Sequence, residues 1–223
     1  MILERSINMF SLFKKAKTWP ETPFEEIKKR ARLLVIDDDI FPYGELFKRD
    51  GYAIEQWRDV DDLNKLETGA FDLILLDVQG VGKAISASEQ GLGVLHHIRK
   101  VAPAQVVIAF SSADFSLKYQ DFFRLADATL SKSADYVDFK RKVDELLRER
   151  FSLGFYVNRI IQAADAPPAD RAKLEKEAQE AIMTNKHAGL KTYLWDKVTN
   201  KDNIDVAIKI AKIATEVADK WQK

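Results

Sequence analysis

The sequence predicts an α/β fold built around a parallel β-sheet. Four short apolar runs of strand length each end in polar residues, and helix-like stretches separate the runs. Apolar residues occupy consecutive positions in these runs, which is typical of strands that are buried on both faces. Strands that alternate with helical stretches favour parallel pairing through helical crossovers. The runs are residues 33–39, 71–77, 106–111 and 128–132.

The polar residues that end the four runs should lie together. Ligands of open parallel sheets bind beyond the carboxyl ends of the strands, so residues at these ends share one crevice. The residues are Asp37, Asp38, Asp77, Ser111 and Lys132. We therefore expect three carboxylates, a hydroxyl and an ammonium group at one edge of the sheet.

This combination of groups suits a magnesium ion and a phosphoryl group. Carboxylates at close range repel one another at neutral pH, and a hard cation with oxygen ligands relieves the repulsion. Magnesium is typically bound by one or two carboxylates together with phosphate oxygens, which leaves another carboxylate to act as a nucleophile. Phosphoryl transfer needs mainly positioning and charge neutralisation, so these side chains are sufficient for it.

In the order and strand-end placement of these five residues, the sequence resembles the receiver domain of two-component response regulators. In that family an aspartate accepts a phosphoryl group from a histidine kinase. The resemblance covers roughly residues 31–150. It implies a flavodoxin-like fold, with a doubly wound, five-stranded parallel sheet.

The resemblance also implies the metal ligands. Asp37 and Asp38 match the acidic pair that binds Mg²⁺, with Asp38 as the direct ligand. Asp77 matches the phosphoacceptor, which also contacts the metal. The backbone carbonyl of Gln79 completes the ligands that the protein supplies.

Two further positions match groups that contact the phosphoryl oxygens. Ser111 matches the hydroxyl that bonds a phosphoryl oxygen and shifts on activation, and Lys132 matches the lysine that pairs with the phosphoryl charge. The implied partners are a histidine kinase or phosphotransfer protein and a protein output partner. The resemblance also allows a homodimer. Receivers usually dimerise through the face that corresponds here to residues 116–151.

Three departures from the family pattern lie beside these residues. The glycine that follows the acceptor comes late, at Gly91, so residues 80–90 form an insertion. Ser133 stands where family members have a proline after a cis peptide. A non-proline cis bond costs about 3 kcal/mol, so we expect a trans or a strained peptide. Thr129 replaces an aromatic switch residue, so signalling by rotation of an aromatic ring is not expected.

Composition narrows the class of protein. The 223 residues suffice for one domain of common size and an appendage, and the absence of cysteine excludes disulfides. A formal net charge of zero gives no overall attraction to nucleic acid or membrane. Because no apolar run has the length of a spanning helix and no signal-peptide pattern is present, we expect a cytoplasmic location.

We expect three regions along the chain: residues 1–30, 31–150 and 151–223. Residues 1–30 predict a short amphipathic helix that ends before a break at Trp19 and Pro20. The helix would pack on the receiver or on a second copy, with a membrane-surface anchor as the alternative. Its apolar residues are Leu3, Ile7, Phe10 and Phe13. Within the receiver, helices are expected near residues 41–50, 91–101, 116–125 and 136–151.

Residues 151–223 predict an α-helical module. Helical patterns are interrupted at Pro167 and Pro168 and again near Asn200, and the aromatic residues Trp195 and Trp221 are expected in its core. Positive charge is interleaved with negative charge and no helix-turn-helix pattern is present, so a DNA-binding output is not expected. A protein-binding output is the preferred interpretation.

Two other functions remain open at this point. The first is an adaptor that keeps the receiver fold as a docking surface without being phosphorylated, which the insertion, Ser133 and Thr129 allow. The second is a haloacid-dehalogenase-like phosphatase, because residues 37–41 resemble its opening motif. That enzyme would need another acidic pair on a strand after Lys132, and it leaves Asp77 without a role. No catalysis beyond self-phosphorylation and self-dephosphorylation is expected.

Overall fold

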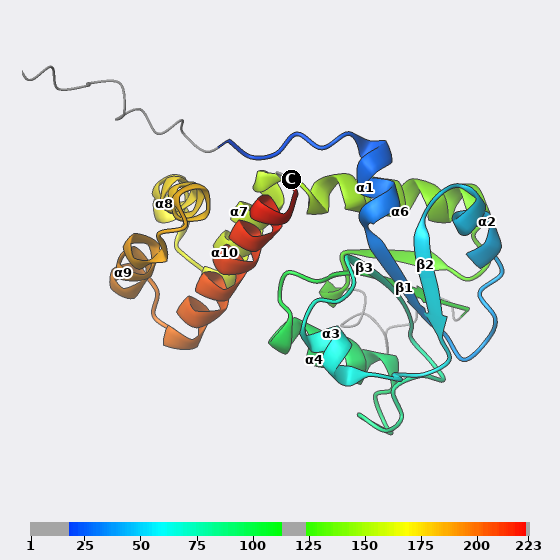
Figure 1. Ribbon diagram of the computed structural model, residues 1–223. Helices are drawn as coiled ribbons and strands as arrows, with labels where there is room; N and C mark the ends of the chain where they lie inside the picture. The colour runs from blue at the N-terminus through cyan, green and yellow to red at the C-terminus, as the bar shows by residue number, and fades with distance from the viewer. Residues whose placement is uncertain (1–17, 113–123, 222–223) are drawn as a thin grey trace, which may run out of the picture.

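A five-stranded, all-parallel sheet with the order β2-β1-β3-β4-β5 forms the centre of the molecule. The computed structural model describes residues 18–112 and 124–221 (Figure 1). The chain runs from β1 outward to β2 and then returns past β1 to β3, so the strand order reverses beside β1. The predicted doubly wound, flavodoxin-like fold is therefore confirmed. The strands are β1 (Arg32–Ile36), β2 (Ala53–Trp57), β3 (Leu73–Asp77), β4 (Val106–Ser111) and β5 (Ala128–Ser131).

Helices cover both faces of the sheet. Successive residues of a strand point to opposite faces, and β1 accordingly sends Leu33 and Val35 into one core and Leu34 and Ile36 into the other. The first core is covered by α1 (Phe24–Arg30), α2 (Gly44–Arg49) and α6 (Tyr136–Arg150). The second is covered by α3 (Leu63–Glu67) and α4 (Gly91–Val101). Because both faces of the sheet are buried, its central strands consist of consecutive apolar residues and do not alternate with polar ones.

Three of the four helices expected in the receiver are present. Those predicted near residues 91–101 and 136–151 match α4 and α6, and α2 is shorter than the prediction for residues 41–50. The helix expected at residues 116–125 lies mostly outside the described part of the chain, as does the one expected from Leu3 to Phe13. The helix α1 was not predicted, because its single buried residue, Ile27, leaves no apolar periodicity to detect.

The region after Phe151 is helical, as predicted. It contains α7 (Leu153–Ala164), a 3₁₀ turn (Pro168–Asp170), α8 (Arg171–Thr184), α9 (His187–Lys197) and α10 (Lys201–Trp221). An additional break between α8 and α9 lies at Asn185, which has a left-handed backbone (φ 57°), and this break was not predicted. None of the helices described here is long and apolar enough to cross a lipid bilayer.

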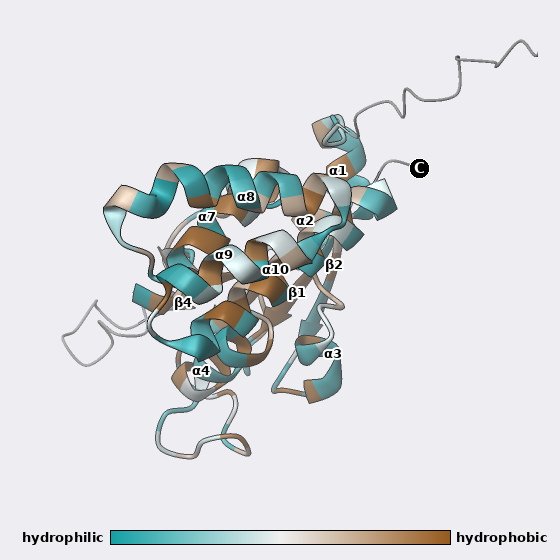
Figure 2. Ribbon diagram, turned by 90° about the vertical axis from the view of Figure 1, so that its left-hand side faces the viewer, coloured by the Kyte–Doolittle hydropathy of each residue, from teal (hydrophilic) through white to brown (hydrophobic). Residues whose placement is uncertain are grey.

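The helical module has its own core, in which α7 and α10 are the inner helices. Figure 2 shows hydrophobic stretches on these two helices, whereas α8 carries many hydrophilic residues along its length. The prediction that Trp195 belongs to the core is wrong, because its side chain is 55 % exposed. It lies on the outside of α9, where the ammonium group of Lys201 is 4.6 Å from the centroid of its ring. Trp221 is buried, as expected.

The helical module packs against the receiver at the end of α10. The indole ring of Trp221 lies 4.3 Å from the ring of Phe151, and the guanidinium of Arg30 lies 4.2 Å from the same indole. Lys209 donates a hydrogen bond to the carbonyl of Val101. Trp221 therefore belongs to a core cluster of the receiver although it lies at the far end of the chain.

A cluster of three charged side chains joins the two parts at a second place. Asp127, just before β5, accepts a hydrogen bond from Arg99 of α4 at 2.9 Å and another from Arg159 of α7. The same carboxylate accepts the backbone N–H of Val107 at 2.7 Å. All three charged side chains are mostly buried. This cluster, called the Asp127 cluster below, links β5 to the helical module.

Candidate functional site

The carboxyl ends of the strands bring three of the predicted residues into direct contact. The ammonium group of Lys132, directly after β5, lies 2.9 Å from Oδ1 of Asp37 and 2.8 Å from Oδ2 of Asp77. Asp37 follows β1 and Asp77 ends β3, and both carboxylates are buried. A single cation thus bridges two buried carboxylates that are far apart in the sequence.

Ser111 lies beside this group at the end of β4. It is 4 % exposed and pairs with Ser131 in the parallel register of β4 and β5. The backbone N–H of Lys132 donates to the carbonyl of Ser111 at 2.9 Å. The hydroxyl-bearing residue and the lysine are therefore coupled through the backbone.

The protein environment perturbs the two charged partners differently. Burial raises the pKa of Asp77 above its ordinary value, and the hydrogen bond from Lys132 opposes this rise without cancelling it. Burial alone would lower the pKa of Lys132, but the hydrogen bonds to Asp77 and Asp37 outweigh it and raise the pKa. Lys132 is therefore a cation at neutral pH, and its charge favours ionisation of Asp77.

An acidic turn follows β1 beside this pair. Carboxylate oxygens of Asp37, Asp38 and Asp39 lie within 4.8 Å of one another, and Asp38 and Asp39 are exposed. Asp37 is the only one of the three that is bound to Lys132 among the described contacts. An all-oxygen donor set at this spacing fits a hard divalent cation. The predicted ligands Asp37 and Asp38 are thus adjacent, and Asp39 joins them, whereas the carboxylate of Asp77 lies outside this group.

The loop after Asp77 approaches the acidic turn closely. A Cβ atom on Gly80, which has φ of 85°, would lie 2.2 Å from Oδ2 of Asp38. The backbone N–H of Gln79 donates to Oδ1 of Asp77 at 3.3 Å. The loop of Gln79 and Gly80 therefore contacts both Asp77 and the acidic turn, and the side of Gly80 that faces Asp38 has no room for a Cβ atom.

The insertion at residues 80–90 is anchored to the receiver. Val81 is fully buried, the N–H of Gly80 donates to Oε1 of Gln90 at 2.8 Å, and the N–H of Gly82 donates to Asp59. At its end, a Cβ atom on Gly91 would lie 2.1 Å from the carbonyl oxygen of Asp77. This close approach of Gly91 to the end of β3 explains a glycine at this position.

The segment around Lys132 contains two of the positions at which the sequence departs from the receiver pattern, Thr129 and Ser133. No cis peptide bond occurs among the described residues, so Ser133 follows a trans peptide. The hydroxyl of Ser133 lies 2.7 Å from that of Ser131, and its N–H donates to the same oxygen. Thr129 is half-buried in β5.

Two residues that sequence reasoning missed support the site. The side-chain amide of Gln56, at the end of β2, donates to the carbonyls of Asp37 and Asp39 at 3.2 and 2.6 Å. The ring of Phe110 lies 5.6 Å from the ammonium of Lys132. The only signal for Gln56 was a polar residue near the carboxyl end of a strand, which is too common to single out.

Several solved structures that are similar to part of this chain are receiver domains or response regulators. A receiver domain protein from Methanospirillum hungatei is 26% identical, and the match covers 54% of this chain and 95% of that chain with a TM-score of 0.46. A response regulator from Thermotoga maritima in complex with Mg²⁺ and BeF is 28% identical, with 52% and 98% covered and a TM-score of 0.43. A receiver domain from Vibrio parahaemolyticus is 22% identical, with 54% and 92% covered and a TM-score of 0.46.

No family model and no curated protein matches the chain. These structural matches cover about half of it. The five-stranded sheet order places Asp37, Asp77, Ser111 and Lys132 at the strand ends where the receiver resemblance predicted them. The stretch after Lys132 forms α6, so the strand with a further acidic pair that a haloacid-dehalogenase-like phosphatase would need is replaced by a helix.

Proposed function

We propose that this protein is a phosphorylation-dependent response regulator in which Asp77 accepts a phosphoryl group. The observation that carries the proposal is the bridge from Lys132 to both Asp77 and Asp37 at the carboxyl edge of the sheet. A lysine in this position can form an ion pair with the free carboxylate of Asp77 and, after transfer, with the phosphoryl group on it. The donor would be a histidine kinase, a phosphotransfer protein or a small phosphodonor.

In the transfer step, a carboxylate oxygen of Asp77 forms a bond to phosphorus while the bond to the donor breaks and the donor leaves with the electron pair. Lys132 would stabilise the negative charge on the phosphoryl oxygens, and the hydroxyl of Ser111 would donate to one of them. Asp37, Asp38, Asp77 and the carbonyl of Gln79 would hold Mg²⁺, which neutralises charge during the transfer. The output would be a changed protein interaction or dimerisation through the helical module.

The decisive experiment is intact mass after incubation with acetyl phosphate and MgCl₂. We expect the native chain to gain one base-labile phosphoryl group, and chelation of Mg²⁺ to prevent the gain. Asp77→Asn removes the nucleophile, so the adduct should be absent. Asp202→Asn, which changes an exposed aspartate in the first turn of α10, should leave the adduct unchanged. A folded native chain without an adduct would instead support the adaptor function.

Gly80→Ala should raise the Mg²⁺ concentration that gives half-maximal phosphorylation by about tenfold, a change that corresponds to about 1.4 kcal/mol. The reason is that the new methyl group would collide with the carboxylate of Asp38. The rate of adduct formation across a magnesium titration measures this change.

Gly69→Ala is the matched control for this prediction. Gly69 also has a positive φ, 68°, but no atom lies within 4 Å of the place that the new methyl group would take. Both variants therefore share the backbone cost of roughly 1 kcal/mol, and only Gly80→Ala disturbs the acidic turn. Equal magnesium dependence in the two variants would contradict a role for Asp38 in metal binding.

A further inference from the structure

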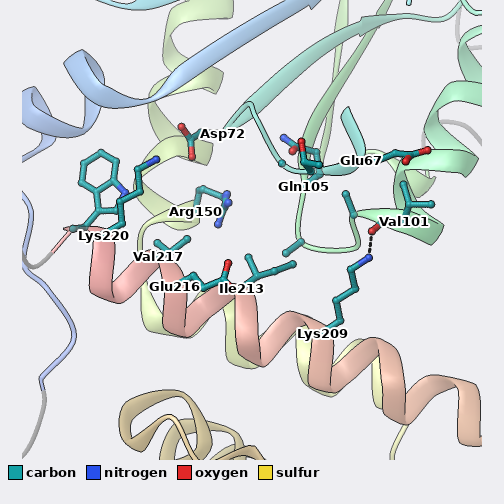
Figure 3. A pocket seen from close by; sticks show the side chains of 15 residues that line it. Glu67, Asp72, Val101, Gln105, Arg150, Lys209, Ile213, Glu216, Val217 and Lys220 are labelled. Carbon is teal, nitrogen blue, oxygen red and sulfur yellow. Dashed lines mark hydrogen bonds between the residues drawn. The ribbon is translucent and has the colours of Figure 1, made fainter. Parts of the chain in front are cut away.

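The helical module and the receiver enclose a cavity of about 270 Å³ at the edge of the sheet opposite the phosphorylation site. The receiver contributes residues that precede two strands, Asp72 before β3 and Gln105 before β4. The helix α10 supplies the facing wall, from Lys209 to Trp221. Figure 3 shows this cavity between α10 and the strand ends, with Arg150 pointing into it.

Arg150 is the unusual member of this lining. It is the last residue of α6 and only 6 % of it is exposed. Within the part of the chain that the structure describes, its Nε and Nη1 atoms are buried and have no hydrogen-bond partner. No described carboxylate lies within ion-pair distance of its guanidinium. A buried guanidinium without a counter-charge costs several kcal/mol, so an anion beside it would be strongly favoured.

The surrounding groups do not supply this counter-charge. Asp72 and Asp127 act on Arg150 only as charges at longer range, since no described carboxylate forms an ion pair with its guanidinium. Glu67 is paired with His97 at 2.8 Å. The nearest contacts of the guanidinium in the described part of the chain are aromatic rings, with the centroid of Tyr156 at 5.2 Å. Burial accordingly lowers the pKa of Arg150, which an anion in the cavity would reverse.

The geometry points to a binding site for a compact organic monoanion whose carboxylate pairs with Arg150. A hydrogen bond between a guanidinium and a carboxylate is charge-assisted and therefore stronger than one between neutral groups. The apolar walls formed by Val101, Ile213 and Val217 suit a short hydrocarbon body. The other charged residues of the lining are three carboxylates (Glu67, Asp72 and Glu216) and two lysines (Lys209 and Lys220), so without Arg150 the lining has a net charge of −1 and does not favour a polyanion.

Binding at this site would also act on the arrangement of the two parts. One wall belongs to the receiver and the other to α10, so a ligand in the cavity contacts both and stabilises their docked arrangement. This inference does not rest on phosphorylation of Asp77, since the cavity lies at the opposite edge of the sheet. Binding of a small anion would thus regulate the protein independently of the proposed phosphorylation of Asp77.

The test is the melting temperature of the full chain titrated with sodium butyrate, with sodium chloride at the same ionic strength as the reference. We expect a saturable rise with butyrate, and smaller rises with succinate and inorganic phosphate. Arg150→Met should weaken the apparent affinity for butyrate by about tenfold or more, since a hydrogen-bonded charge pair is lost. Arg141→Met, on an exposed face of the same helix, should retain the affinity.

A second variant tests the site in case Arg150→Met does not fold. Ile213→Trp keeps Arg150 and fills the cavity from α10, so it should abolish the butyrate effect while the chain stays folded by circular dichroism. Asp77→Asn should respond to butyrate like the native chain, which separates this site from the proposed phosphorylation. Equal responses to butyrate and chloride, or an undiminished butyrate response in Ile213→Trp, would overturn the inference.

Discussion

Lys132→Met should lower the free energy of unfolding by about 2 to 3 kcal/mol at neutral pH in buffer that contains a chelator. The ammonium of Lys132 is the group that bridges the buried carboxylates of Asp37 and Asp77. Methionine keeps most of the side-chain volume but leaves these two negative charges without their cation. In the proposed phosphoryl transfer the ammonium would also stabilise the transferring group, so adduct formation with acetyl phosphate should slow by about 100-fold.

The loss of stability in Lys132→Met should depend on pH with a defined sign. Burial already raises the pKa of Asp77 above its ordinary value of 3.8, and removal of the cation should raise this pKa further. A carboxyl group with a raised native pKa binds protons more tightly in the folded state, so stability falls as pH rises through that pKa. The difference between native chain and variant should therefore be small near pH 4 and complete at pH 7.

Urea unfolding at a series of pH values measures this difference. Lys142→Met is the matched control, because Lys142 forms a partly exposed ion pair with Glu145 within α6. Such a surface pair contributes at most about 1 kcal/mol, so the control should show little change at any pH. A difference between native chain and Lys132→Met that stays constant from pH 4 to pH 8 would show that Asp77 is not coupled to Lys132.

Phe139→Ala should destabilise the receiver by about 3 to 5 kcal/mol. The ring of Phe139 is 1 % exposed and lies on the inner face of α6. Its centroid lies 5.4 Å from that of Phe41, 5.5 Å from Tyr43 and 5.9 Å from Phe110. Replacement by alanine would leave a cavity at the centre of this aromatic cluster, and close-packed neighbours can fill it only in part.

Urea unfolding also measures this loss, with Val137→Ala as the control on the same helix. Val137 is 67 % exposed, so truncation of its side chain should change the free energy of unfolding by less than about 0.5 kcal/mol. A loss below about 1 kcal/mol for Phe139→Ala would mean that the aromatic cluster repacks around the smaller residue.

The parallel sheet could be predicted because its signals are local in the sequence. Each of the four apolar runs carries its own polar ending, and parallel pairing alone is enough to bring Asp37, Asp77 and Lys132 together. Burial on both faces makes the runs continuous and easy to detect. The strand β2 has a weaker signal, because it lies at the edge of the sheet and most of its residues are partly or fully exposed.

The features that could not be predicted depend on contacts between distant segments. The amide of Gln56 holds the acidic turn only because β2 lies beside β1, and nothing within β2 indicates this contact. The exposed position of Trp195 follows from how α9 turns relative to α8 and α10, which the residue type does not reveal. The cavity around Arg150 likewise exists only because α10 returns to the receiver.

The Asp127 cluster has a consequence for the evolutionary exchange of output regions. Where a flexible linker joins a receiver to its effector, either half can be recombined with a foreign partner without loss of buried contacts. In this chain, Arg159 of α7 supplies one of the two cations that bind Asp127, and Arg30 of α1 lies over the indole ring of Trp221. A chimera that replaced the helical module would leave the carboxylate of Asp127 without one of its cations and Arg30 without its aromatic contact, so exchange of one half alone should destabilise the protein.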